Sequence, residues 1–297
     1  MERSRGADIL ADNIVHRVDT DTVLKPWLIT LALLAPVVLG TFIAYGNLYL
    51  DDGKYFRSDI GHYLAGTLVY GLFLLECGEI SFLLYTIVRR NRNHLERDAA
   101  WMDALCTYAE EHRSGSSKMR ATAAGCRGVI SGPATALSMA AWVFEMLMLI
   151  VLGILLATTP PDSVNTYATK AVILLPPTLL VLLAQFVLTA GSVFGFPARH
   201  DKLQSDFTRE FSTVASGFGL HVGTMDHEVR IRKVWPHIVL TVLTLGLYLF
   251  IYIFISCKEM NHHLASQWAY EEDLLGRIIE FEGGTGIEPA ESDTGKT

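Results

Sequence analysis

Long apolar runs are the feature that most constrains how this chain can fold. A helix rises about 1.5 Å per residue, so roughly 20 apolar residues cross the hydrocarbon core of a bilayer, which is about 30 Å thick. Runs long enough to do this lie at about 27–49, 63–88, 134–157, 171–196 and 235–257. The sequence therefore predicts an all-α polytopic membrane protein, a helical bundle with four transmembrane helices and a fifth apolar segment.

Composition agrees with a membrane environment. Of the 297 residues, 51% are hydrophobic and 19% are charged, a charged fraction below the quarter that is typical of soluble domains. The net charge of −7 does not indicate nucleic-acid binding, because the acidic residues concentrate near the C-terminus. The lipid bilayer is therefore the expected partner of the chain, and nucleic acid is not.

The connections between the runs predict an orientation. The connections 50–62 and 158–170 contain two and one basic residues, whereas 89–130 and 197–235 contain eight and six. Cytoplasmic loops of membrane proteins carry an excess of Lys and Arg. We therefore expect the two longer connections and the N-terminus to lie in the cytoplasm, in a multi-pass protein of the cell membrane.

The fifth run, 235–257, has two possible structures. It is long enough for a single transmembrane helix, which would place the C-terminus outside. However, Gly246 lies near its centre and basic residues flank both ends. A re-entrant hairpin with both ends in the cytoplasm is the alternative, because backbone turns at membrane depth are tolerated where protein covers them.

Three parts of the chain share a pattern that indicates an internal repeat. Pro26, Pro133 and Pro236 each open an apolar run, and proline suits the first turn of a helix. Amphipathic helical segments follow the second, fourth and fifth runs, at 93–105, 201–214 and 262–275. The predicted unit is thus a helical hairpin in the membrane followed by a cytoplasmic amphipathic helix, and the third copy is truncated.

These signals divide the chain into seven segments. An N-terminal cytoplasmic segment (1–25) is followed by the first repeat unit (26–113), a linker (114–132) and the second unit (133–218). A second linker, the truncated third unit and a disordered tail complete the chain, at 219–235, 236–282 and 283–297.

The stretch LTVLTLGLYLFIYIFISCKEMNHHL, residues 240–264, resembles a pattern of small uncharacterised prokaryotic integral membrane proteins. In that pattern, T-L-G-[IL]-Y is followed by aromatic residues, a basic residue and a polar helix. The resemblance covers about a tenth of the chain. It implies a membrane protein and carries no activity.

Polar residues at mid-depth are the principal candidates for a site. Glu76, Glu79, Glu145 and Gln185 lie near the centres of predicted spans, where no Lys or Arg is available to pair with them. Such residues face the bundle interior and by default mark the path of an ion, a proton or a ligand. We predict a bound proton or hard cation here and no other cofactor. Protonated glutamates that hydrogen-bond across helices as structural contacts are the alternative.

Two pairs of residues, each containing histidine, are weaker candidates for metal binding. His94 and Asp98 are four residues apart on a predicted helix, a spacing that is more typical of an exposed ion pair than of a metal site. His262 and His263 are adjacent and should point to different helix faces. The four cysteines lack CxxC spacing and are expected to be reduced and buried. No hydrolase, zinc-protease or nucleotide-binding motif occurs, so no catalytic residue is predicted and an enzyme is not favoured.

Two functions are compatible with these features. The first is a transporter or channel-like protein in which the mid-membrane carboxylates bind a proton or cation. The second is a non-catalytic scaffold or signalling protein, in which the amphipathic helices of 89–113, 199–218 and 259–282 bind a cytoplasmic protein partner. Assembly with further copies of the chain is compatible with either function.

Overall fold

The structure is a computed structural model, and it describes residues 4–49, 59–112, 115–127, 133–158, 164–226, 229, 233–244 and 246–284. Over these residues the chain forms helices joined by short connections, and no strand occurs among them. The helices are α1 (Arg5–Val15), α2 (Arg17–Thr20), α3 (Pro26–Tyr49), α4 (Asp59–Glu111), α5 (Ser117–Arg127), α6 (Pro133–Thr158), α7 (Val164–Ala190), the π-helix η1 (Gly191–Gly195), α8 (Phe196–Ser216), α9 (Val234–Leu243) and α10 (Leu247–Gly284).

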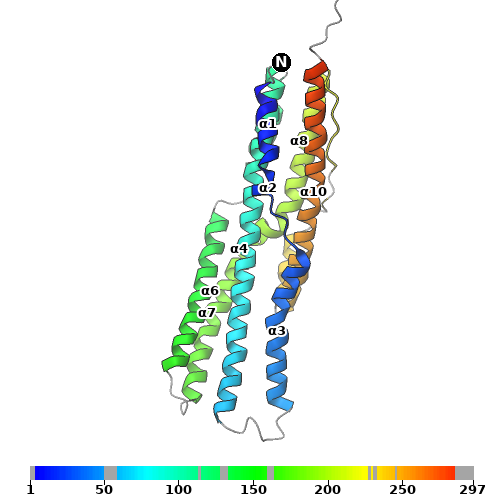
Figure 1. The fold of residues 1–297 in the computed structure, drawn as a ribbon. Coiled ribbons are helices and arrows are strands. Elements are labelled where there is room, and N and C mark those ends of the chain that lie inside the picture. Colours follow the sequence, from blue (N-terminus) through cyan, green and yellow to red (C-terminus); the bar gives the residue numbers. More distant parts are fainter. Residues whose placement is uncertain are drawn as a thin grey trace, which may run out of the picture.

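The helices form an elongated bundle with an apolar end and a polar end (Figure 1). Helices α3, α6 and α7 and the first half of α4 make up the apolar end. Four helices are long and apolar enough to cross a membrane, and they lie in α3, in α4, in α6 and in α7 with its continuation. The predicted all-helical class and its four membrane-length helices are confirmed.

Three helices continue from the apolar end into the polar end. Helix α4 has 53 residues, or about 80 Å at the rise of an α-helix, which far exceeds the thickness of a bilayer. Helix α7 passes through η1 into α8 without leaving the bundle, and α10 extends over 38 residues. The predicted amphipathic segments are therefore extensions of the apolar helices. The internal repeat stays a prediction.

The apolar faces of these extensions pack against one another. Leu95 of α4, Phe207 of α8 and Leu264 of α10 lie in one buried cluster. Helix α1 lies along α4, where Leu10 joins the same cluster and Gly6 approaches the backbone of Tyr108. The bundle core thus buries the amphipathic faces that the sequence predicted to bind a cytoplasmic partner.

The fifth apolar run folds as a helical hairpin. Helix α9 ends at Leu243, and α10 begins at Leu247 after Gly246, whose φ of 95° suits glycine. His237 Nδ1 lies 2.9 Å from the Tyr248 hydroxyl, and the His237 ring stacks on Tyr252 at 3.8 Å. Helix α9 therefore folds back along α10, and a single continuous helix over 235–257 is excluded.

A candidate metal centre in the helical bundle

Three buried histidines meet where α4, α8 and α10 enter the polar end. They are His94, His200 and His263, with exposed fractions of 0%, 0% and 1%. Their ring centroids are 4.9 to 5.7 Å apart, and each pair meets edge to face. One ligating nitrogen of each ring lies within 4.8 Å of the other two. Three helices that are distant in sequence thus present their imidazoles to one point.

Carboxylates fix the orientation of two of the rings. His94 Nδ1 lies 2.8 Å from Asp21 Oδ1, and His263 Nδ1 lies 2.9 Å from Asp201 Oδ1. An Nδ1–H that donates to a carboxylate leaves the Nε2 lone pair available as a ligand. Within the described residues, His263 Nε2 has no hydrogen-bond partner. This backing of histidine by carboxylate is the outer-shell arrangement that metal-binding histidines adopt.

Asp98 places a carboxylate oxygen beside one of the three rings. Its Oδ1 accepts hydrogen bonds from Gln204 and Gln267 at 2.8 and 2.7 Å. Its Oδ2 lies 3.2 Å from His200 Nε2, and that nitrogen is 3.0 Å from His94 Nε2. Two ligands of a tetrahedral zinc ion at about 2.0 Å are about 3.3 Å apart. Each of these two distances is close to the separation of two ligands of one ion.

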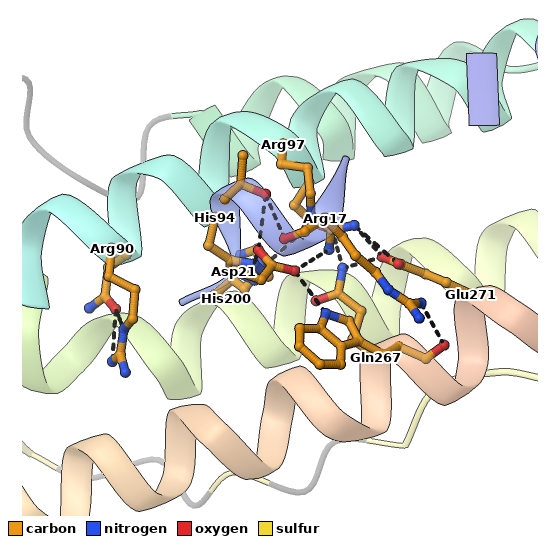
Figure 2. Close-up of polar contacts among 12 residues, drawn as sticks. Arg17, Asp21, Arg90, His94, Arg97, His200, Gln267 and Glu271 are labelled. Carbon is orange, nitrogen blue, oxygen red and sulfur yellow. Dashed lines mark hydrogen bonds and ion pairs between the residues drawn. The ribbon is translucent and has the colours of Figure 1, made fainter. Parts of the chain in front are cut away.

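An ion-pair network lies beside these side chains, between them and α10 (Figure 2). Arg97 lies 3.1 Å from Asp21 and 2.9 Å from Glu271. The Trp268 indole N–H donates to Asp21 Oδ2 at 2.9 Å, and Gln267 joins Glu271 to Asp98. Asp21, in the N-terminal segment, is thus held by side chains of two helices, α4 and α10.

The network changes the acidity of its carboxyl groups. Burial raises the pKa of Glu271 to about 7, although the Arg97 guanidinium opposes that rise. Burial alone would raise the pKa of Asp21 as well, but its hydrogen bond to His94 and the charge of Arg97 hold it below the ordinary value. Asp21 is therefore ionised at neutral pH, while Glu271 exchanges a proton there.

A thiol lies beside His200. Cys126 of α5 is fully buried, and its Sγ is 3.6 Å from His200 Nδ1, on the ring edge opposite Nε2. Asp98, Cys126 and His200 form a second group whose ligating atoms lie within 4.8 Å of one another. The four cysteines are buried and not in disulfides, in line with prediction.

The structure divides the predicted metal candidates. His94, Asp98 and His263 enter the site, whereas His262 is exposed on α10. His200 was missed, since no local spacing marks a lone histidine in a polar helix. One signal was available. His94, His200 and His263 each lie at or next to the start of one of the three amphipathic segments.

The mid-membrane candidates occupy other positions. Gln185 is buried and donates to the backbone carbonyls of Ser81 and Ser138. Glu145 packs near Gly78 of α4, and Glu79 lines an apolar groove between α3 and α4. Glu76 is buried in α4. Within the described residues these carboxylates do not converge as the histidines do, and their role in ion or proton binding stays a prediction.

The chain matches no family model, no curated protein and no solved structure. The chemistry of the site is therefore argued from its own geometry.

Glu271 makes stability depend on pH in a defined direction. Its folded pKa of about 7 lies above the ordinary 4.5, so between these values the unfolded chain loses a proton that the folded chain keeps. The free energy of unfolding should then fall by about 3 kcal/mol as pH rises from 4.5 to 7. Glu271→Gln should remove most of this slope.

The measurement is the unfolding midpoint in detergent across this pH range, with a chelator present. Glu272→Gln is the matched control, because Glu272 is exposed and pairs with Arg17. Equal slopes in the two variants would contradict the assignment to Glu271.

Proposed function

We propose that this chain is a membrane protein whose polar bundle binds one divalent transition-metal ion, with zinc as the favoured metal. The ligands are Nε2 of His94, His200 and His263 and a carboxylate oxygen of Asp98. The observation that carries the proposal is the convergence of three buried imidazoles, two of which are backed by carboxylates. Imidazole with one carboxylate is a donor set that zinc accepts in tetrahedral geometry.

The charge of the surrounding layer supports a cation. Asp21, Asp98, Asp201 and Glu271 are buried together with the guanidinium of Arg97. When all four carboxyl groups and Arg97 are ionised, the layer has a net charge of −3. Buried charge is costly unless it is paired. A divalent ion at the histidines and a proton on Glu271 would together balance this excess.

The enclosure of the site indicates its role. Zinc sites with four protein ligands and no open position are structural, whereas catalytic sites keep a position for water or substrate. Here the ligands come from α4, α8 and α10, which all continue into or alongside apolar helices. Bound metal would therefore fix the spacing of the membrane helices, and we infer that the metal occupancy controls their arrangement.

The orientation in the membrane belongs to the same proposal. The excess of basic residues in 89–130 and 197–235 supports a cell-membrane protein with the polar bundle and the N-terminus in the cytoplasm. Helix α10 begins alongside α3 and contacts it (Figure 1). The α9–α10 hairpin then enters the membrane from the cytoplasmic side and returns, with the C-terminus also in the cytoplasm.

A second candidate function is transport of a proton or cation through the membrane part, in a transporter or channel-like protein. One observation favours it. Glu145 is fully buried on α6, and within the described residues neither of its carboxylate oxygens has a hydrogen-bond partner. Thr178 of α7 is likewise fully buried with an unpartnered hydroxyl. Buried oxygens without donors suit a proton or a hard cation.

A scaffold function through the amphipathic helices has less support. Leu95 and Phe207 lie in the bundle core, and Trp268 packs against it. A cytoplasmic partner or a second copy of the chain would have to bind the remaining, polar surface of the bundle.

The transport proposal predicts a loss of flux in one variant. Glu145→Gln should lower proton flux into proteoliposomes by at least about tenfold, because glutamine cannot carry the proton across the barrier. Glu272→Gln in the polar bundle is the control and should transport at the wild-type rate. Flux in Glu145→Gln equal to wild type, or wild-type flux equal to that of empty liposomes, would contradict transport by this residue.

The metal proposal predicts different results for two adjacent histidines. The chelator-stripped protein should take up about one zinc ion per chain, and zinc at a hundred times Kd should raise its stability by about 2.7 kcal/mol. His263→Ala should abolish both effects, whereas His262→Ala should retain them, because His262 is exposed. Metal analysis and thermal unfolding measure the two quantities. Equal zinc content in both variants would contradict the site.

A further inference from the structure

The proposed metal site is enclosed, so an ion needs a route to it. All four ligand residues are at most 1% exposed. Helices α4, α8 and α10 are long and pack in the bundle core. The shorter elements beside the site are the N-terminal segment, which supplies Asp21, and the 11-residue α5, which supplies Cys126. These two sides are the candidate approaches for an ion.

The α5 side carries a second set of ligands. Asp98, Cys126 and His200 bring one ligating atom each within 4.8 Å of the others. Sulfur and nitrogen bound to one tetrahedral zinc ion are about 3.5 Å apart, given bonds of about 2.3 and 2.0 Å. The observed distance from Cys126 Sγ to His200 Nδ1 is 3.6 Å. The two groups share His200, which offers Nδ1 to one and Nε2 to the other, and Asp98 Oδ2 lies 3.2 Å from that Nε2. The Asp98 carboxylate can therefore hold the ion while it passes from one ring nitrogen to the other.

A surface groove lies beside this second set. It runs between α5 and α8, and its lining includes Gly125, Leu203, Asp206 and Glu210. Gly125 directly precedes Cys126, and Leu203 directly precedes Gln204, which hydrogen-bonds to Asp98. Two carboxylates at the groove, each paired with a basic residue, offer exchangeable oxygen ligands near the entrance.

We propose that Asp98, Cys126 and His200 form a second, transient position for a divalent transition-metal ion, through which it moves between this groove and the three histidines. The inference rests on the metal binding proposed above. When the Cys126 sulfur binds the ion, its thiol releases a proton to water. When the ion moves on to the Nε2 atoms of the three histidines, the Nε2–H proton of His200 is released and the Cys126 thiolate regains a proton. Each step exchanges one metal–ligand bond for another, and no redox change occurs.

The tautomers of the metal-free cluster agree with this route. His94 donates from Nδ1 to Asp21, so its Nε2 accepts from His200 Nε2–H. His200 Nδ1 then carries a lone pair toward the Cys126 thiol. The ion takes the Nδ1 lone pair and the sulfur together, so the thiol proton leaves with the water that the ion sheds on entry.

The test is the rate of zinc exchange in the full-length, detergent-purified protein, with zinc alone as the probe. Zinc release to a chromogenic chelator and uptake by the stripped protein are followed by stopped flow, and equilibrium affinity by competition. Cys126→Ser and Cys126→Ala should slow both rates by at least about tenfold and leave Kd within about threefold. Cys106→Ser is the matched control, since Cys106 is equally buried on α4 and belongs to neither ligand set.

The remaining outcomes overturn the inference in distinct ways. Exchange at the wild-type rate in both Cys126 variants would exclude the thiol from the route. A loss of affinity equal to the change in rate would make Cys126 a resident ligand. Faster exchange in Arg17→Ala, with Cys126→Ser unchanged, would place the route at the N-terminal segment. Failure of the wild-type protein to bind zinc would instead refute the proposed function itself.

Discussion

The structure depends on a layer of buried charged groups that pair with one another where three long helices leave the apolar end. Asp21, Asp98, Asp201 and Glu271 are all buried there beside Arg97 and three imidazoles. An isolated carboxylate in such a place would be strongly destabilising. Each of these groups instead has a partner on another element: Asp21, which follows α2, with His94 of α4, Asp201 of α8 with His263 of α10, and Glu271 of α10 with Arg97 of α4. The relative positions of these helices are thereby determined.

Apolar packing on both sides encloses this layer. One buried cluster, with Trp101, Phe207 and Leu274, lies in the polar end of the bundle. A second cluster, with Leu84, Phe186 and Ile253, lies toward the apolar end. Because water is excluded from both sides, electrostatic interactions in the layer are stronger than at a surface. The same enclosure suits the proposed metal site, and an ion that binds there needs a route of entry.

Local pattern predicted much of the fold and about half of the site. Apolar length predicted the four membrane-length helices, and Gly246 with its basic flanks indicated the hairpin as one of two alternatives. The spacing of His94 and Asp98 on one helix, and the position of His263 next to His262, made these residues candidates for metal binding. What spacing cannot show is which faces of separate helices meet. His94 and His263 are 169 residues apart, and only packing brings His200, Asp21 and Asp201 beside them. The mid-membrane glutamates were selected because charged residues are rare at that depth. That rarity reflects the free-energy cost of burying a charge and does not show which side chains the glutamates contact.

The central claim is that three histidines and one aspartate hold a single zinc ion. X-ray absorption at the zinc edge of protein loaded with one equivalent tests this most directly. The account predicts a first shell of four nitrogen or oxygen atoms at about 2.0 Å, with outer-shell scattering from three imidazoles and no sulfur. A sulfur shell at about 2.3 Å, or six oxygen ligands without imidazole scattering, would contradict it.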